Sequence, residues 1–335
     1  MSKSKIEWCD KTWNPVTGCT PISPGCANCY AERMAKRLKA MGQHRYKNGF
    51  NVTEQVDALD EPYKWKKPCT IFVCSMSDLF HESIDYEFLD QVFSVMALNA
   101  KHTYLVLTKR PENMKKYFEQ CPNFLRWPQK NVWLGVTAES QEQADKRIPV
   151  LLSIPAAKRF VSVEPMLGPV DLTETILIND YRRSVLEISP LEPPNTPDNR
   201  LDWVICGGES GPNARPMHPD WARSLRDQCE AAGTPFMFKQ WGAFGFDGYA
   251  MAKVGKKAAG RILDGVVHDG RPAISEIEFD ERCHFDYKGD YCSCSGTAAH
   301  CNKTFEDCKQ RGNEQRFGGF PSQWSQLRRK SDAAR

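Results

Sequence analysis

The sequence lacks long apolar runs and a strong net charge. No stretch approaches the roughly 18 consecutive apolar residues of a membrane-spanning helix, and the N-terminal segment MSKSKIEWCDKTWNP lacks the apolar core of a secretory signal. The 45 Lys and Arg residues nearly balance the 42 Asp and Glu residues, which leaves a formal net charge of +3. Such a small charge neither requires nor excludes a nucleic acid partner. We therefore expect a globular, cytoplasmic protein that does not contact membranes.

Cysteine is abundant by comparison, with 14 residues in the chain. The reducing cytoplasm disfavours disulfides, so clustered thiols there are more often metal ligands or reactive groups. Isolated cysteines in apolar or helical surroundings are interpreted as small buried hydrophobic residues, and four belong to this class: Cys69, Cys121, Cys206 and Cys229. Most of the other cysteines lie in two dense groups that need another explanation.

Short apolar runs that end abruptly in polar residues alternate with segments of helical period between residues 70 and 240. The runs are TIFVCSMSD (70–78), TYLVLTKR (103–110), NVWLGVTAES (131–140), KRFVSVEP (158–165), LDWVICGGES (201–210) and TPFMFKQW (234–241). Continuous apolar strands alternating with helices predict a parallel sheet that is buried on both faces. With one more strand before Cys19, the pattern predicts an α/β fold with a full or partial (β/α) barrel. A doubly wound open sheet is the alternative.

Helices are expected at 86–100 and 218–233, and directly after a cysteine loop at residues 30–42. We assign residues 1–242 to the barrel. Residues 243–335 lose the strand–helix rhythm and become rich in glycine and cysteine, so they are expected to form a small C-terminal extension. The proline-rich segment 188–200 is expected to be an excursion between two strands.

Acids, bases and hydroxyls gather at the ends of the expected strands. In a (β/α) barrel these ends converge on one mouth, where such enzymes carry out their chemistry. The polar residues there are Ser75, Ser77, Asp78, Thr108, Lys109, Arg110, Thr137, Glu139, Ser162, Glu164, Glu209, Ser210, Lys239 and Gln240. The motif GGESG (207–211) has two interpretations, since its glycines suit either close approach to a ligand or a purely conformational role.

The first dense group of cysteines lies in the loop WNPVTGCTPISPGCANCY (13–30), which contains Cys19, Cys26 and Cys29. A structural zinc site needs four ligands, and the fourth could come from Cys9 or Cys74. Three thiolates on a [4Fe–4S] cluster would instead leave one iron open to a small molecule. Both kinds of site remain possible from the residues alone.

This loop, which follows a first strand and immediately precedes a helix, resembles the radical S-adenosylmethionine (SAM) superfamily and the cysteine loop of spore photoproduct lyases. Its spacing, Cys-x6-Cys-x2-Cys, departs from the usual Cys-x3-Cys-x2-Cys. Over about residues 5 to 265 the chain is also similar to a phage- and prophage-associated family of radical-SAM-like proteins of unassigned activity. The motifs that carry this similarity are GC…SPGCANCYAERMA, SMSDLFH, LTKRP, GVTAES, SVEPML, CGGESG and FKQWG.

The resemblance implies that Cys19, Cys26 and Cys29 hold a [4Fe–4S] cluster. It also implies that SAM binds the open iron and is cleaved to a 5′-deoxyadenosyl radical, with electrons from a donor such as flavodoxin or ferredoxin. The contacts to SAM would come from Tyr30, Ser75, Ser77, Asp78, Thr137 and Glu139. The substrate would be bound and converted by Glu164, Glu209 and Lys239, together with Gln240.

Phage association suggests, by analogy, a nucleobase or nucleotide as the substrate of DNA modification or repair. Phosphates would then meet Lys109, Arg110, Arg147, Arg215 and Lys239, and a base would stack on Trp203 or Trp241. Two other functions remain open. In the first, Asp78, Glu139, Glu164 and Glu209 bind a divalent metal for hydrolysis and the thiols bind structural zinc. In the second, the protein is a non-catalytic zinc-containing module that binds nucleic acid.

The second dense group of cysteines lies in RCHFDYKGDYCSCSGTAAHCNKTFEDC (282–308). Its possible ligands are Cys283, His284, Cys292, Cys294, His300, Cys301 and Cys308. The segment has few large apolar residues for a core of its own, so a metal would supply the missing stability. We expect a second site that uses four of these residues, with zinc preferred over an auxiliary iron–sulfur cluster.

Overall fold

The computed structural model describes residues 4, 6–120, 127–173, 200–246 and 248–274. The chain divides into two compact units, Met1–Ile277 and Glu278–Arg335, and the description concerns the first of them. Several predicted features lie outside the described residues, namely residues 188–199 of the proline-rich segment, Cys121 and the whole second cysteine group, Cys283, His284, Cys292, Cys294, His300, Cys301 and Cys308.

Seven parallel strands form the central sheet, and their order in the sheet follows their order in the chain. They are β1 (Lys11–Trp13), β4 (Thr70–Val73), β5 (Thr103–Thr108), β6 (Val132–Thr137), β7 (Lys158–Val163), β8 (Trp203–Gly207) and β9 (Phe236–Gln240). A barrel has this sequential order, whereas a doubly wound sheet reverses direction part-way. The edge strands β1 and β9 do not pair with each other. The sheet is therefore a curled, partial (β/α) barrel, and the doubly wound alternative is wrong.

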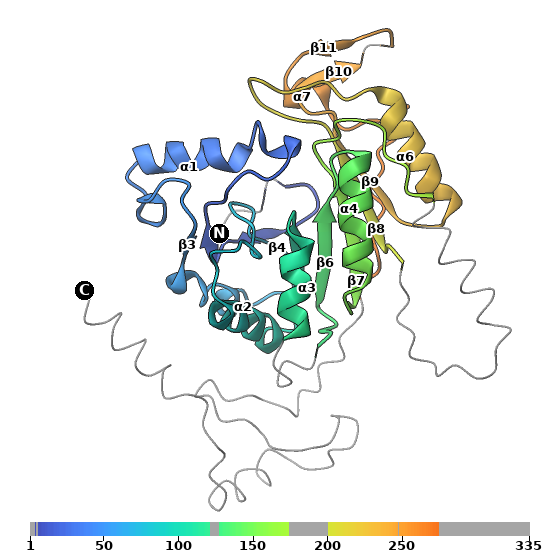
Figure 1. Ribbon diagram of the computed structural model, residues 1–335. Coiled ribbons are helices and arrows are strands. Elements are labelled where there is room, and N and C mark those ends of the chain that lie inside the picture. The colour runs from blue at the N-terminus through green and yellow to red at the C-terminus, as the bar shows by residue number, and fades with distance from the viewer. Residues whose placement is uncertain (1–3, 5, 121–126, 174–199, 247, 275–335) are drawn as a thin grey trace, which may run out of the picture. The chain divides into compact units, whose positions relative to one another are not determined.

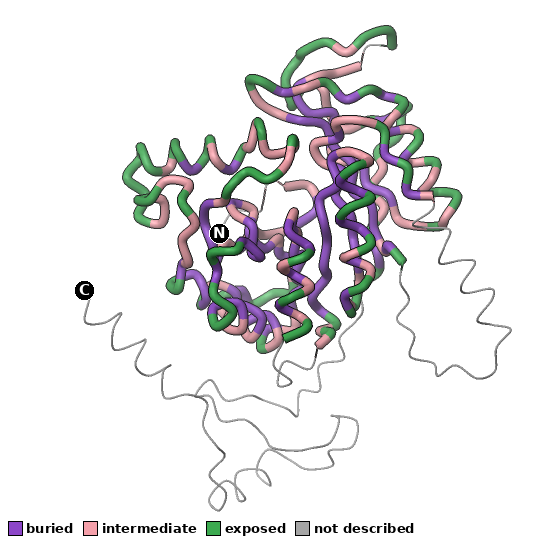
Figure 2. Tube along the Cα trace, viewed as in Figure 1, coloured by how far each residue is buried: buried purple, intermediate pink, exposed green. Residues whose placement is uncertain are grey.

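Helices cover the outer face of this half-barrel. They are α2 (Tyr86–Leu98), α3 (Pro111–Glu119), α4 (Gln141–Leu152) and α6 (Pro219–Ala231), which follow β4, β5, β6 and β8 (Figure 1). A further helix, α1 (Tyr30–Ala40), directly follows the cysteine loop. Burial is concentrated on the strands and on the helix faces that meet them, as expected for amphipathic helices on a sheet (Figure 2). None of the helices in the described ranges has the length and apolarity to cross a bilayer.

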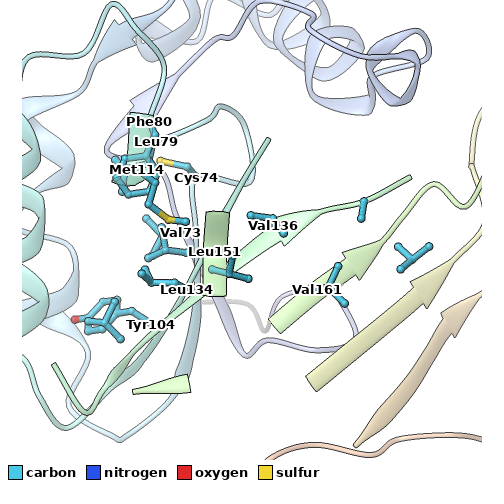
Figure 3. Packing of buried hydrophobic residues seen from close by; sticks show 14 of the residues in the cluster. Val73, Cys74, Leu79, Phe80, Tyr104, Met114, Leu134, Val136, Leu151 and Val161 are labelled. Atoms are coloured by element: carbon cyan, nitrogen blue, oxygen red, sulfur yellow. The ribbon is translucent and has the colours of Figure 1, made fainter. Parts of the chain in front are cut away.

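Alternation along the strands divides the buried side chains between two cores. On β6, Leu134 and Val136 pack in the outer core, where Figure 3 shows them near Val161, Met114 and Leu151. The inner core contains a separate aromatic cluster that includes Trp8, Trp133, Phe160 and Trp203. The inner face of the half-barrel is thus filled at its base by aromatic rings.

Shorter elements complete the described part of the chain. They are β2 (Val16–Thr17) paired with β3 (Thr53–Glu54), β10 (Phe244–Phe246) paired with β11 (Met251–Lys253), α7 (Lys256–Ala259), and the 3-10 turns η1 (Pro24–Cys26), η2 (His44–Tyr46), η3 (Val56–Ala58) and η4 (Pro62–Lys64). The segment 243–274 packs on the end of the sheet. There Trp241 Nε1 donates to Ile262 O at 2.8 Å, and Trp203 Nε1 donates to Gly270 O at 2.7 Å. These contacts join the segment to the same compact unit as the barrel.

Candidate functional site

The cysteine loop lies over the carboxyl ends of the strands. Its three thiols, Cys19, Cys26 and Cys29, are free and partly exposed, and Cys29 immediately precedes the first turn of α1. The loop begins at Gly18, which has a φ of +85°, and a Cβ there would lie 2.2 Å from Asn51 O. Only glycine therefore fits where β2 leads into the loop.

Arg110, just after β5, provides the first anchor for this loop. Its guanidinium donates to Cys19 Sγ at 3.4 Å and to the Thr20 carbonyl at 3.0 Å. Burial raises the pKa of the Cys19 thiol to about 11, the negative charge of Asp78 adds to this shift, and Arg110 opposes it. Without a metal, Cys19 is therefore a protonated thiol at neutral pH, and coordination would be needed to remove its proton.

Glu139, just after β6, provides the second anchor. Its side chain is fully buried and accepts hydrogen bonds from the Ser23 hydroxyl, from Gly25 N at 3.2 Å and from Arg147 Nη1 at 2.8 Å. Burial alone would raise the pKa of Glu139, but the Ser23 hydroxyl and the Arg147 charge outweigh it and hold the pKa below its usual range. A Cβ at Gly25 would come within 2.9 Å of the Glu139 carboxyl group, so glycine permits this close approach.

Glu209, just after β8, provides the third anchor. It accepts from Arg215 Nη2 at 2.6 Å and from Asn28 Nδ2 at 3.1 Å, while Arg215 also donates to Pro24 O at 3.1 Å. Burial alone would raise the pKa of Glu209, but the hydrogen bonds from Arg215 outweigh it and keep the pKa low. Residues from three strand ends thus hold the cysteine loop at separate points between Cys19 and Asn28.

Gly208 of GGESG and Gly242 have a conformational role. A Cβ at Gly208 would lie 2.0 Å from Trp241 O, and a Cβ at Gly242 would lie 2.1 Å from Glu209 O. The two loops that follow β8 and β9 are bonded directly through their backbones, with Gly208 N donating to Gln240 O at 2.9 Å. Close backbone packing therefore accounts for Gly208 of this motif without a ligand.

Four of the residues expected to contact SAM, Tyr30, Ser75, Ser77 and Asp78, lie together, and their polar atoms bond within the protein. Asp78 is 6% exposed, and it accepts from Thr108 Oγ1 at 2.7 Å, from Phe80 N at 3.1 Å and from Lys109 N at 3.0 Å. Two neighbouring residues are bonded in the same way: Ser77 Oγ donates to Val16 O at 2.7 Å, and Ser75 Oγ donates to Asn14 Oδ1 at 3.1 Å. Tyr30 also lies here, with its hydroxyl donating to Ser75 O at 3.0 Å.

The inner face above the aromatic base has polar groups with unused hydrogen-bonding capacity. Thr137 and Ser162 are register partners on β6 and β7, and within the described part of the chain their hydroxyls make no hydrogen bond. Lys239 Nζ lies 2.6 Å from Glu164 Oε1, which leaves the second oxygen of this carboxylate without a partner among the described residues. Gly207 lies beside Glu164, since a Cβ atom at position 207 would be 3.3 Å from the carboxyl carbon of Glu164.

Each predicted carboxylate has its own basic partner. The pairs are Asp78–Arg110, Glu139–Arg147, Glu164–Lys239 and Glu209–Arg215. A divalent ion would require several carboxylates to converge on one centre. Across the described ranges, no group of three or more His, Cys, Asp or Glu side chains is arranged to hold a metal ion. The four carboxylates are therefore engaged in separate ion pairs.

A family model described as "Protein of unknown function (DUF5131)" matches residues 3–272. The chain belongs to this family. No curated protein matches the chain.

Three solved structures of spore photoproduct lyase show a weak likeness to this DUF5131 chain. The complex with dinucleoside spore photoproduct is 11% identical, with a TM-score of 0.37, and the match covers 65% of this chain and 71% of that one. A cysteine-to-serine variant of the lyase is also 11% identical, with a TM-score of 0.40 and coverage of 69% and 75%. A likeness at this level assigns neither a substrate nor a reaction to the chain.

Several residues of the site were not identified from the sequence. Ser23, Gly25 and Asn28 bond to strand-end carboxylates through the folded loop, and no local pattern indicates those partners. Gln143 was also missed, although a signal exists. It lies four residues before Arg147 in α4, so the two share a helix face that begins directly after the β6 strand end.

Proposed function

We propose that this member of the DUF5131 family is a radical SAM-type enzyme that binds a [4Fe–4S] cluster through Cys19, Cys26 and Cys29 and acts on a nucleobase or nucleotide. One observation carries the proposal. Three free thiols lie on a single loop that residues from three strand ends hold above an inner face with unused polar groups. A loop fixed in this way would present a cofactor to the interior of the half-barrel.

The donor set fits a cluster better than a single zinc ion. In a tetrahedral zinc site with Zn–S bonds of about 2.3 Å, the ligand sulfurs lie about 3.8 Å apart around one centre. No three possible ligands among the described residues are arranged around one centre in this way. In a [4Fe–4S] cluster each cysteine binds a different iron, so the thiols need not share a centre. Arg110 would also donate to the sulfur of Cys19, and such hydrogen bonds stabilise cluster thiolates.

The chain's own residues would have distinct roles. Arg110, Glu139 and Glu209 position the cysteine loop. Thr137 and Ser162 provide hydroxyls on the inner face for the cofactor, and Glu164 with Lys239 provides a charged pair for the substrate. When bound, the cluster and SAM together supply a 5′-deoxyadenosyl radical that abstracts hydrogen from carbon. Asp78 and Glu139 would act through the fold, because hydrogen bonds within the protein already occupy their oxygens.

An electron donor such as flavodoxin or ferredoxin would dock near α1. Arg37 and Lys39 on this helix are exposed and have no ion pair among the described residues, and the helix begins immediately after Cys29. Changing both residues to Gln should slow the reduction of the cluster by an acidic donor protein but not by dithionite. Equal slowing with both reductants would contradict this docking position.

Iron analysis tests the cluster. Changing Cys19, Cys26 or Cys29 singly to Ala should remove most of the iron from protein purified without oxygen, together with its brown colour and its electron paramagnetic resonance signal. Cys74→Ala is the matched control, because Cys74 is buried in the outer core next to the strand end and should leave the iron content unchanged. Full iron in all three variants would rule out the assignment.

SAM cleavage tests the reaction class. The reduced protein should convert SAM to 5′-deoxyadenosine. Thr137→Val removes a hydroxyl with little change in volume, so it should weaken SAM binding and leave the cluster spectrum intact. A fully loaded protein that neither binds SAM nor changes its spectrum when SAM is added would exclude the radical mechanism.

A further inference from the structure

A cleft of about 490 Å³ lies on the outer side of the cysteine loop. Ile22 and Pro24 of that loop line one side of it, and residues from the starts of α3 and α4 line the other. These two helices lie side by side on the outer face of the sheet (Figure 1). None of the inner-face residues Thr137, Ser162, Glu164 and Lys239 lines this cleft.

The cleft contains polar side chains that have no partner among the described residues. Lys109 and Lys146 line it, and neither makes an ion pair or a side-chain hydrogen bond within the described part of the chain. Gln143 also lines it. This side chain is only 7% exposed, yet its amide has no hydrogen-bond partner among the described residues. The amide atoms themselves remain accessible from the cleft, so this side chain is available to a ligand there.

The other basic residues near the mouth are already paired. Of the five expected to meet phosphates, four bind carboxylates in the ion pairs Arg110–Asp78, Arg147–Glu139, Arg215–Glu209 and Lys239–Glu164. Lys109 is the fifth. Its charge helps to keep the pKa of Glu139 low, but it makes no direct ion pair in the described residues. Lys109 and Lys146 therefore remain available to an anion.

The N-termini of α3 and α4 also favour the binding of an anion. Ser140 precedes α4 and Arg110 precedes α3, and neither side chain caps the backbone N–H groups of the first turn. Uncapped first turns favour anions, and phosphate is the usual ligand of such ends. Three carboxylates, Glu82, Glu112 and Glu142, also line the cleft. All three are exposed, so water and salt screen their charges, and Glu82 is paired with Arg110.

We propose that this cleft binds a phosphate group, carried by a nucleotide or by a nucleic acid strand. The assignment of that phosphate to the substrate rests on the proposed function. The ammonium groups of Lys109 and Lys146 would donate to the phosphate oxygens, and the Gln143 amide would donate one further hydrogen bond. A phosphate held here, against Ile22 and Pro24, would bring the attached nucleoside next to the cysteine loop.

Calorimetric titration of the full-length chain, purified without oxygen, tests the cleft. The probes are inorganic phosphate, a nucleoside monophosphate and a short single-stranded oligonucleotide. Lys109→Gln and Lys146→Gln should each weaken phosphate binding by about fivefold, the size expected for a solvent-exposed ion pair. For the oligonucleotide, each change should also reduce the slope of log K against log salt by about 0.7. Gln143→Leu should weaken binding without altering that slope.

Lys116→Gln is the matched control, because Lys116 is an exposed lysine of α3 that does not line the cleft. Binding of the oligonucleotide alone would identify a strand as the source of the phosphate, whereas comparable binding of the monophosphate would identify a nucleotide. The proposal is overturned if no probe binds the wild type, or if the cleft variants bind like Lys116→Gln. Iron content and SAM cleavage, measured on the same samples, test the proposed function separately from the cleft.

Discussion

Basic residues at the mouth of the half-barrel and in the neighbouring cleft are used in different ways. At the mouth, Arg147, which also lines the cleft, bonds to Glu139 and Arg215 bonds to Glu209, and both carboxylates also bond to the cysteine loop. In the cleft, Lys146 precedes Arg147 in the same helix but has no ion pair within the described residues. Basic residues that form ion pairs therefore stabilise the structure, whereas basic residues without an ion pair remain available to a ligand.

Burial explains this difference. The Glu139 and Arg147 side chains are 0% and 3% exposed, and a charge at such a site is tolerated only with a partner. Lys146 is exposed, so water solvates its charge and no partner is needed. Burial therefore also ranks the expected effects of mutation on the free energy of unfolding. These effects should be largest at the buried Glu139–Arg147 pair and smallest for the lysines of the cleft.

The largest expected effect is that of Glu139→Gln. This change leaves the buried Arg147 without its counter-charge and weakens the bonds to Ser23 and Gly25. We expect a loss of about 3 kcal/mol in the free energy of unfolding, measured by urea denaturation. Glu142→Gln, an exposed change in the first turn of the nearby helix, is the control and should cost less than about 0.5 kcal/mol. Equal losses would show that the Glu139 pair is not an anchor.

A smaller loss is expected for Glu209→Gln. Its partner Arg215 is 36% exposed, so water can solvate the guanidinium after the pair is broken. We expect a loss of about 1 kcal/mol in the free energy of unfolding, because Asn28 and Pro24 lose part of their anchoring. In protein loaded with the proposed cluster, the same change should speed the release of iron to a chelator. If this variant lost as much stability as Glu139→Gln, exposure would not be what distinguishes the two pairs.

The low pKa of Glu139 also predicts a dependence on pH. Its folded pKa lies below the ordinary value of 4.5, so at pH values between the two the unfolded chain binds a proton that the folded chain does not. The stabilisation by this carboxylate is therefore complete above about pH 4.5 and is lost as the pH falls through the folded pKa. The difference in melting temperature between wild type and Glu139→Gln should be constant from pH 7 to about pH 5 and shrink below that. A difference that widened at low pH would contradict this sign.

The fold was largely predictable from the sequence. Strands buried on both faces are nearly continuous apolar runs, so all six expected runs contain a strand, from Thr70–Val73 to Phe236–Gln240. The expected helices at 86–100 and 218–233 are present as Tyr86–Leu98 and Pro219–Ala231. The alternation of strands and helices indicated a barrel, but only the pairing of strands in space excluded the doubly wound sheet.

The candidate site was predictable in position but not in detail. The strand ends were correctly expected to gather polar residues, because parallel strands end at one edge of the sheet. The partners of those residues were not predictable, because they come from distant parts of the chain. Glu139 bonds to Ser23, more than a hundred residues earlier, and Asp78 bonds to Thr108 of the next strand. Such contacts depend on the folded loop, and no local pattern specifies them.

The smallest expected effect on stability is that of the cleft lysines. Lys109→Gln and Lys146→Gln break no ion pair among the described residues. Lys146 is exposed and Lys109 is half-buried, so water solvates the first charge fully and the second in part. We expect the free energy of unfolding to change by less than about 0.5 kcal/mol for Lys146→Gln. The change should be slightly larger for Lys109→Gln, because the Lys109 charge helps to keep Glu139 ionised. Urea denaturation of both variants, with Lys116→Gln as the control, measures these changes in the free energy of unfolding. A loss of stability near that of Glu139→Gln would mean that these lysines stabilise the fold. The contrast between paired basic residues at the mouth and unpaired lysines in the cleft would then no longer hold.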